Sequence, residues 1–499
     1  MQRFTFLLTL VTLAALTAAP ASAQWSAQAL SQARQGPVAV SVSDLALFAG
    51  GDVAGTPSAV VDVYDDASGM WSTAKPLSVA RTGLAATRMG HLALFAGGAD
   101  SLSTETTVVD IYDASKGAPS NPAAWSTATL SQARFNLAAT TVGSKAIFAG
   151  GATGGISSPN AIASDVVDIY DASKGAPSNP AAWSTATLSE ARSQIAAATA
   201  GNRALFAGGF TGAAASATVD IYDDTTGLWC TASLSQARAW MDATAVGMRA
   251  YFGGGSIAGS TMTDAVDIYD ASKGAPCNPA AWSTATLSVA RGEASAAAVG
   301  NTILFAGGVE SGFVPSDVVD VLNVGTGHWS SSASLSQARA GMGATSVGGK
   351  ALFAGGTSGF GSPHAVVDVY EPVGLNHCIA ATNSTGCAAS ISATGSMSLA
   401  ANDLTLSSVC VPDGFFIFFH GSAQAQAPFG NGYLCAGGGL VRIPPPSIAS
   451  GGLAQKTVDL PSAGITSPGA RNFQCWFRDS AAGGANFNLS DALEITFVP

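Results

Sequence analysis

Residues 133–151 read ARFNLAATTVGSKAIFAGG, and close variants of this stretch occur seven times in the chain. Each copy has an Ala-Arg or similar pair, an apolar run rich in small residues, and consecutive glycines. A run like Val-Asp-Ile-Tyr at 167–170 and a lone tryptophan such as Trp183 complete the repeat. The glycine pairs are Gly50-Gly51, Gly97-Gly98, Gly150-Gly151, Gly208-Gly209, Gly254-Gly255, Gly307-Gly308 and Gly355-Gly356. Their spacing of 46 to 58 residues is typical of propellers and solenoids.

Each repeat is expected to contain four short strands. In the quoted copy they fall at 137–142, 146–148 and 166–170, with a fourth at Trp183, and turn residues separate them. No segment of the repeat has a helical period. Because a four-stranded sheet cannot bury both of its faces alone, neighbouring repeats must stack, and a closed ring of sheets leaves no long exposed edge.

The repeat resembles the kelch repeat. The similarity consists of the basic residue that opens the inner strand, the double glycine after the second strand, the tyrosine of the third and the tryptophan of the fourth, and it covers about residues 24–373. Two copies depart from the pattern, with Leu322 in place of the tyrosine and three glycines at 253–255. The resemblance implies an all-β fold, namely a seven-bladed kelch-type β-propeller.

The chain ends of the repeat region predict how the propeller closes. Trp25 lies in a segment that matches the fourth strand of a repeat, and it is followed at 30–34 by the Leu-Ser-Gln-Ala-Arg sequence that begins the next repeat. No first three strands precede it, whereas the seventh repeat ends at Tyr370 without a tryptophan after it. We therefore expect the N-terminal strand to complete the last blade. Seven tryptophans give seven blades: Trp25, Trp71, Trp125, Trp183, Trp229, Trp282 and Trp329.

Residues 374–499 form a second domain, predicted to be a small antiparallel β-sandwich. The sequences around Cys435 (GYLCAGG) and Cys475 (NFQCWFRD) resemble a C-terminal module that follows varied domains in secreted bacterial proteins. That resemblance implies no particular activity.

The first 23 residues are predicted to be a secretory signal peptide. They hold one basic residue, an apolar stretch and an Ala-Ser-Ala ending, so cleavage after Ala23 and a secreted, extracellular or cell-surface location are expected. No later segment has about 20 uninterrupted apolar residues, which argues against a transmembrane span. The net charge is −11 with 11% charged residues, and no basic patch predicts nucleic-acid binding. We expect a monomer.

Seven cysteines in an exported chain point to disulfides. Cys230 and Cys277 stand where the corresponding positions of other repeats have serine, in adjacent blades and on one face, which predicts a bond between them. Cys378 and Cys387 are expected to pair locally. Cys410, Cys435 and Cys475 are then left to share one bond and one free thiol.

One arginine and one aspartate recur in every repeat, as Arg134 and Asp168 do in the third. Seven arginines in a ring are compatible with an anion site in the channel. The interpretation we favour is a structural contact repeated seven times, because a scaffold needs identical contacts and a ligand rarely does.

Sequence variation concentrates just after each arginine and in the loops after each glycine pair, and these segments share one face of the predicted propeller. A carbohydrate or a protein ligand is the expected partner there, because aromatic, amide and carboxylate side chains occur together. Small propellers also fill their inner strands with whatever fits, so packing alone is the alternative. The candidate ligand-binding residues are Phe135, Asn136, Gln194, Trp240, Asp242 and Glu293.

A propeller followed by a β-domain also resembles the architecture of galactose oxidase, whose copper needs two Tyr, two His and a Cys linked to one Tyr. Here only Tyr251 and Tyr433 lie outside the repeated tyrosine position, and the five histidines show no ligand spacing. We therefore assign no catalytic residue, metal or cofactor. The predicted function is a secreted or cell-surface binding scaffold; the alternative is a propeller enzyme of galactose-oxidase or glycosidase-like class that uses unrecognised loop residues.

Overall fold

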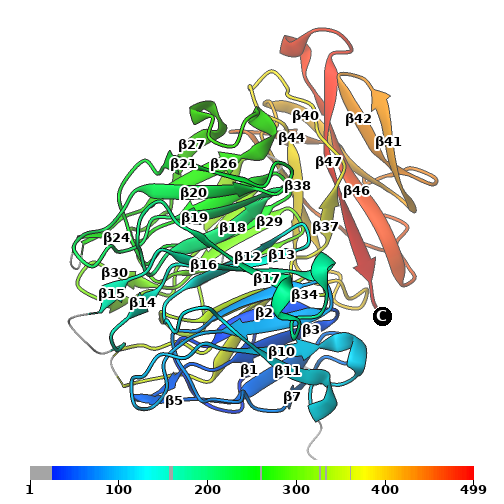
Figure 1. The fold of residues 1–499 in the computed structure, drawn as a ribbon. Helices are drawn as coiled ribbons and strands as arrows, with labels where there is room; N and C mark the ends of the chain where they lie inside the picture. The colour runs from blue at the N-terminus through cyan, green and yellow to red at the C-terminus, as the bar shows by residue number, and fades with distance from the viewer. Residues whose placement is uncertain (1–24, 157–160, 259–260, 325–326, 332–333, 360) are drawn as a thin grey trace, which may run out of the picture. The chain divides into compact units, whose positions relative to one another are not determined.

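The computed structural model describes residues 25–156, 161–258, 261–324, 327–331, 334–359 and 361–499, and the predicted signal peptide lies outside them. The chain divides into two compact units, Gln24–Asn376 and His377–Pro499. Both are built from antiparallel β-sheets (Figure 1).

The first unit contains seven four-stranded antiparallel sheets within the described residues. In six of them the four strands follow one another in the chain, as in β2-β3-β6-β7; in the seventh, β1 pairs with β36 in the order β1-β36-β35-β34. The first three sheets comprise β2 (Val38–Val42), β3 (Leu45–Ala49), β6 (Val61–Asp65), β7 (Met70–Thr73); β8 (Ala85–Met89), β9 (Leu92–Ala96), β10 (Val108–Asp113), β11 (Trp125–Thr129); β12 (Ala138–Val142), β13 (Lys145–Ala149), β16 (Val166–Asp171), β17 (Trp183–Thr187). The other four comprise β18 (Ala196–Ala200), β19 (Arg203–Ala207), β20 (Thr218–Asp223), β21 (Leu228–Ser233); β22 (Asp242–Val246), β23 (Arg249–Gly253), β26 (Ala265–Asp270), β27 (Trp282–Thr286); β28 (Ser295–Val299), β29 (Thr302–Ala306), β32 (Val319–Asn323), β33 (His328–Ser331); β1 (Trp25–Ala29), β34 (Gly343–Val347), β35 (Lys350–Ala354), β36 (Val366–Tyr370).

We call the strand that follows the repeated arginine the first strand of its sheet; these strands are β2, β8, β12, β18, β22, β28 and β34. They are rich in alanine, glycine, serine and threonine, and small side chains allow them to lie close to one another. Each contacts the first strand of two other sheets: β2 lies beside β8 and β34, β12 beside β8 and β18, and β22 beside β18 and β28, which also contacts β34. The hydrophobic core lies between neighbouring sheets. Val61 packs with Phe95 of the next sheet, and Phe48 packs with Leu352 of the sheet that contains β1.

The glycine pairs join each sheet to the next. Gly150 has a φ of +65°, and a Cβ there would lie 2.5 Å from the carbonyl oxygen of Arg192 in the following repeat. The Gly151 amide donates a hydrogen bond to the same oxygen (2.9 Å). Only glycine combines this conformation with so close an approach, which explains why the pair recurs.

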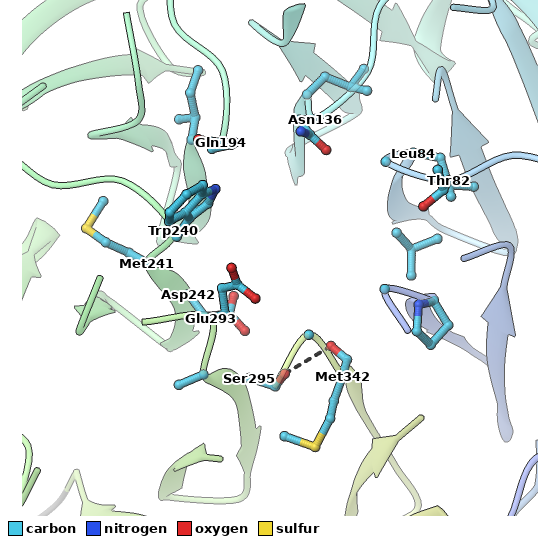
Figure 2. A pocket seen from close by; sticks show the side chains of 18 residues that line it. Thr82, Leu84, Asn136, Gln194, Trp240, Met241, Asp242, Glu293, Ser295 and Met342 are labelled. Carbon is cyan, nitrogen blue, oxygen red and sulfur yellow. Dashed lines mark hydrogen bonds between the residues drawn. The ribbon is translucent and has the colours of Figure 1, made fainter. Parts of the chain in front are cut away.

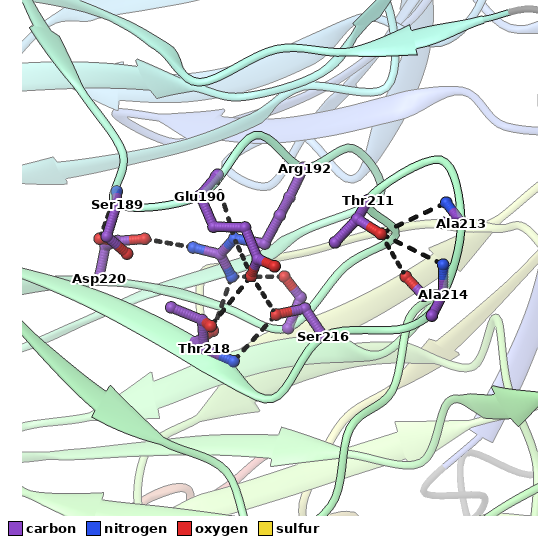
Figure 3. Close-up of polar contacts among 10 residues, drawn as sticks. Ser189, Glu190, Arg192, Thr211, Ala213, Ala214, Ser216, Thr218 and Asp220 are labelled. Atoms are coloured by element: carbon purple, nitrogen blue, oxygen red, sulfur yellow. Dashed lines mark hydrogen bonds and ion pairs between the residues drawn. The ribbon is translucent and has the colours of Figure 1, made fainter.

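The repeated arginines are structural. All seven side chains are 0% exposed, and each forms an ion pair with the repeated aspartate of its own repeat, as Arg134 does with Asp168 (2.8 Å). The Ser131 amide donates to the other oxygen of Asp168 (2.8 Å). Figure 3 shows the fourth repeat, where Arg192 contacts Asp220, and Glu190 accepts hydrogen bonds from nearby hydroxyls. Burial lowers the pKa of Arg134, and the Asp168 carboxylate opposes that shift.

Short ribbons and single turns connect these strands. Two-stranded ribbons follow several glycine pairs: β4 (Asp52–Val53) with β5 (Thr56–Pro57), β14 (Ala152–Thr153) with β15 (Ile162–Ala163), β24 (Ser256–Ala258) with β25 (Thr261–Met262), and β30 (Val309–Glu310) with β31 (Val314–Pro315). The 3₁₀ turns precede three of the tryptophans: η1 (Ala114–Lys116), η2 (Pro122–Ala124), η3 (Ala172–Lys174), η4 (Pro180–Ala182), η5 (Ala271–Lys273) and η6 (Pro279–Ala281). Just before η6, Cys277 forms a disulfide with Cys230 of β21 (Cα–Cα 6.2 Å), which joins two neighbouring sheets.

The second unit consists of antiparallel β-strands. One sheet has the order β47-β46-β40-β43, with β44 also paired to β40; a second has the order β38-β39-β45, and β41 pairs with β42. The strands are β38 (Ser390–Thr394), β39 (Thr405–Val409), β40 (Gly414–Gly421), β41 (Ala423–Phe429), β42 (Gly432–Gly437), β43 (Val441–Arg442), β44 (Ser447–Ala449), β45 (Leu453–Thr457), β46 (Gly469–Arg478) and β47 (Phe487–Phe497); β37 (Leu375–His377) precedes them, and η7 (Ser480–Ala482) lies between β46 and β47.

The predicted bond between Cys378 and Cys387 is wrong. Cys378 is bonded to Cys435, and Cys387 to Cys410, while Cys475 is a buried free thiol. Asn383 holds the two ends of the second bond together. Its side-chain amide donates to the Cys410 carbonyl (2.6 Å), and its backbone amide donates to the Cys387 carbonyl (3.0 Å).

Candidate functional site

A cavity of about 440 Å³ is lined by all seven repeats. We call it the shared cavity. Its eighteen lining residues stand one to four positions after the repeated arginines, where the chain enters the first strand of each sheet. Among the predicted ligand-binding residues, the structure places Asn136, Gln194, Trp240, Asp242 and Glu293 in this lining (Figure 2).

The residue two positions after each arginine has a left-handed backbone. The φ values lie between 51° and 65° in all seven repeats, at Gly36, Gly83, Asn136, Gln194, Trp240, Glu293 and Gly341. This conformation is readily adopted by glycine, is tolerated by asparagine, and costs other residues about 1–2 kcal/mol. It follows an extended residue and precedes a strand, so it reverses the chain locally.

Backbone hydrogen bonds connect these left-handed residues across neighbouring repeats. The Asn136 amide donates to the Gly83 carbonyl (2.7 Å), and the Gln194 amide donates to the Asn136 carbonyl (3.0 Å). The same contact joins Glu293 to Trp240 (2.9 Å), Gly341 to Glu293 (3.3 Å) and Gly36 to Gly341 (2.8 Å). These bonds fix the spacing of the side chains that enter the shared cavity.

The lining is asymmetric. Four consecutive repeats carry a side chain at the left-handed position, whereas the other three carry glycine. A Cβ added at Gly36 or Gly341 meets no atom of a non-neighbouring residue closer than 4.0 Å, so the shared cavity is open on that part of its wall. In Figure 2, Trp240, Asp242 and Glu293 lie across the opening from Thr82 and Leu84.

Asp242 is the first residue of β22 and its carboxylate bridges two sheets. Oδ1 accepts a hydrogen bond from the Ala243 amide (2.8 Å), and Oδ2 accepts one from the Ala296 amide of β28 (2.6 Å). Burial raises the pKa of Asp242 to about 6, and the two amide donors oppose this shift. The carboxyl group therefore changes charge at about pH 6 and is mostly ionised at neutral pH.

Glu293 is the second acid in the lining. Burial raises the pKa of its side chain, and within the described residues its carboxylate has no hydrogen-bond or ion-pair partner. No lysine, arginine or histidine is among the eighteen lining residues. The first strands contain one basic residue, Arg88 of β8, which does not line the cavity. At neutral pH the shared cavity thus carries negative charge without a basic side chain in its lining.

Phe135 does not line the shared cavity. Its side chain is 3% exposed and packs with Ala99 and Ala152, and its amide donates to the Ala152 carbonyl (3.0 Å). The backbone explains the difference: Phe135 is extended and bridged to the next segment, whereas Asn136 has the left-handed turn. The glycines at the equivalent position of three repeats are the sequence signal that marks Asn136 rather than Phe135.

A second, apolar pocket of about 480 Å³ adjoins the shared cavity. Its lining includes Phe210, Ile257 and alanines of the 213–215 loop. Gln194 and Trp240 line both spaces, so the Trp240 side chain forms part of the wall between them. The sequence did not predict this pocket, because its walls come from two loops of different repeats.

No protein-family model matches the chain, and no curated protein matches its sequence. The solved structures include a similar one, "Structure of YjhT", which is 15% identical; the alignment covers 57% of this chain and 93% of that chain, with a TM-score of 0.44. The site described above rests on this chain's own residues.

The described residues contain no helix of the length and apolarity needed to cross a membrane. They also contain no group of three or more His, Cys, Asp or Glu side chains placed to hold a metal ion. Asp242 and Glu293 are therefore a pair of acids without a third ligand of these types.

Proposed function

We propose that this protein is a secreted or cell-surface carbohydrate-binding protein. In this proposal the seven sheets are the blades of a kelch-type β-propeller that is closed by β1, and the shared cavity is the opening of its channel. The register of β1 on β36, from Trp25 opposite Tyr370 to Ala29 opposite Val366, supports the closure. The packing of Phe48 in β3 against Leu352 in β35 also supports closure, because it joins the sheet of β2 to the sheet that contains β1.

One observation carries the binding function: side chains occupy a left-handed position on four consecutive repeats, and all four enter one cavity. Gln194, Trp240 and Glu293 hold this conformation at an energetic cost that glycine avoids in the other repeats. Backbone strain of this kind persists at sites where a side chain is needed in a particular place.

The chemistry of the lining supports a sugar. Amide and carboxylate oxygens accept hydrogen bonds from hydroxyl groups, and the amides of Asn136 and Gln194 also donate. Trp240 offers an aromatic face for the C–H side of a sugar ring, and about 440 Å³ is within the usual range of small-molecule sites.

The test fills the cavity without removing any proposed contact. Gly341→Asn places a side chain in open space at a φ of +60°, which asparagine tolerates. Gly247→Asn is the matched control, because Gly247 has a φ of +58° and open space but does not line the cavity. We expect the mature protein and Gly247→Asn to bind the same sugars on a glycan array and Gly341→Asn to bind none. Equal binding by all three would refute the site.

A protein partner is the other ligand class to compare. If the protein binds no sugar on the glycan array but binds a polypeptide, and no sugar displaces that polypeptide, the carbohydrate proposal fails.

A glycosidase-like enzyme is the second candidate, and the pKa of Asp242 favours it. A carboxyl group that titrates at about 6, in a cavity that also contains a second acid, is suited to acid–base catalysis near neutral pH. Chromatography of an array-positive oligosaccharide after incubation with the protein tests this candidate. Shorter products that disappear with Asp242→Asn would establish hydrolysis, and an intact sugar would leave binding as the function.

A further inference from the structure

The charge of the shared cavity differs from that of the rest of the repeat unit. Every repeated aspartate, such as Asp168, is buried against an arginine of its own repeat. The chain thus compensates its buried scaffold acids. Asp242 and Glu293 have no such partner among the lining residues, and their surroundings penalise their charge. Two carboxylates in one cavity without a basic side chain would be stabilised by a positive charge that the ligand supplies.

The position of Trp240 adds a second feature suited to a cation. Its carbonyl accepts the hydrogen bond from the Glu293 amide (2.9 Å), so the indole and the Glu293 carboxylate enter the cavity from adjacent points of the wall. Figure 2 shows Trp240 on the same side of the opening as both acids. An aromatic face next to carboxylates attracts an ammonium group by the charge distribution of its ring as well as by the two negative charges.

A hard divalent metal ion fits the lining less well than an ammonium group does. Ca²⁺ takes six to eight oxygen ligands. Within the described residues, no third acidic, histidine or cysteine side chain joins Asp242 and Glu293 in a group that could hold a metal ion. An ammonium group needs only a few acceptors and gains from the aromatic face.

We propose that the ligand of the shared cavity is an amino sugar whose amino group is free and protonated. This inference rests on the proposed carbohydrate function and adds the chemical class of the sugar. The ammonium group lies between Asp242 and Glu293 against Trp240, and the hydroxyl groups are left for Asn136 and Gln194.

Three disaccharides with one common skeleton test the inference by titration calorimetry at pH 6.5, where the amine is largely protonated: chitobiose with free amines, its fully N-acetylated form, and cellobiose. We expect chitobiose to bind at least about tenfold more tightly than the other two, because only it carries the charge. Its affinity should fall as salt is raised, and the affinity of cellobiose should not.

The outcomes separate the two proposals. Equal affinity for the three disaccharides would overturn the amine inference and leave the carbohydrate function standing. Binding of none of them would overturn the amine inference, whereas the carbohydrate function falls only if the glycan array also shows no bound sugar. Tighter binding of the acetylated form would also overturn the amine inference.

Variants locate the charge. Glu293→Gln should abolish the preference for chitobiose over cellobiose or reduce it severalfold, and the fold should survive because the Glu293 carboxylate has no protein partner in the described residues. Asp242→Asn is the second variant. Glu190→Gln is the matched control, because Glu190 bonds to scaffold hydroxyls and other repeats have glutamine at its position. An unchanged preference in both cavity variants, with normal melting curves, would refute the placement.

The pH dependence gives an independent readout. The carboxyl group of Asp242 is ionised above its pKa of about 6 and neutral below it. The amine of chitobiose is largely protonated at both pH 5 and pH 6.5, so chitobiose should bind more weakly at pH 5 than at pH 6.5, while cellobiose binding changes little. Glu293 is the only other titratable side chain in the lining, and the same shift acts on it in the same direction. Affinity that is equal at both pH values would contradict the inference.

Discussion

The left-handed position two residues after each arginine can be tested in both directions. Gly341→Ala forces an L-residue into a φ of +60° where its Cβ meets no atom closer than 4.0 Å, so the change measures backbone strain without a clash. Gln194→Gly removes the same strain from the fourth repeat, where φ is +54°. Both positions line the shared cavity, and both belong to the same backbone pattern.

The magnitude follows from two opposing terms. A left-handed L-residue costs about 1–2 kcal/mol, and a change from glycine to alanine recovers about 0.4–1 kcal/mol by restricting the unfolded chain. Gly341→Ala should therefore lower the free energy of unfolding by about 1 kcal/mol. Gln194→Gly should raise it by a similar amount, and it should weaken ligand binding, as expected where a site is strained for function.

Guanidinium denaturation followed by tryptophan fluorescence measures both changes. Asn136→Gly is the control, because asparagine tolerates the left-handed conformation and the substitution should change stability little. If Gly341→Ala leaves the free energy of unfolding unchanged while Gln194→Gly lowers it, the residues at this position are not strained. The argument that the four side chains are kept there for binding would then fail.

Three further outcomes are expected. Replacing Cys230 and Cys277 together by serine should lower stability by about 4 kcal/mol in the loop-entropy model, measured by denaturation with the wild type as reference; no change would mean that the bond does not restrain the unfolded chain. Arg134→Met should cost about 3–5 kcal/mol because Asp168 is left buried and unpaired, and adding Asp168→Asn should restore part of the loss; an unaltered melting curve would contradict the structural role of the ion pair. Deleting β1 should lower the melting temperature markedly because β36 loses one of its two neighbouring strands, and an unchanged melt would refute closure by the N-terminal strand.

The repeat pattern predicted the sheets because every structural requirement recurs seven times. Gly150, Arg134 and Trp183 each have a counterpart in nearly every copy, so one physical explanation applies to all of them. The pair Cys230 and Cys277 was visible for the same reason, since two departures from an otherwise constant serine are informative. The blade count and the closure remain part of the proposal.

The site was predicted only in part, because in the third repeat Asn136 lines the cavity while the adjacent Phe135 is buried outside it. Phe135 and Asn136 both vary among the repeats, but only the second has the left-handed turn. The pairing of Cys378 was missed because the second unit has no internal repeat to reveal its register. Sequence proximity to Cys387 was the only guide there, and hydrogen bonds of Asn383 bring Cys387 to Cys410 instead.

The hydrogen-bonded left-handed residues also bear on how specificity can evolve. Each repeat contributes one such residue, and the backbone there has nearly the same φ whether the residue is Gly341 or Glu293. The backbone path at that position is thus nearly the same for glycine and for larger residues, and one substitution per repeat changes the side chain on one part of the cavity wall. Three repeats share nearly identical text before their tryptophans, such as residues 113–125 and 171–183, which marks recent duplication. Exchange of whole repeats can therefore replace one part of the cavity wall at a time. A new ligand preference can arise in this way while the scaffold contacts are kept.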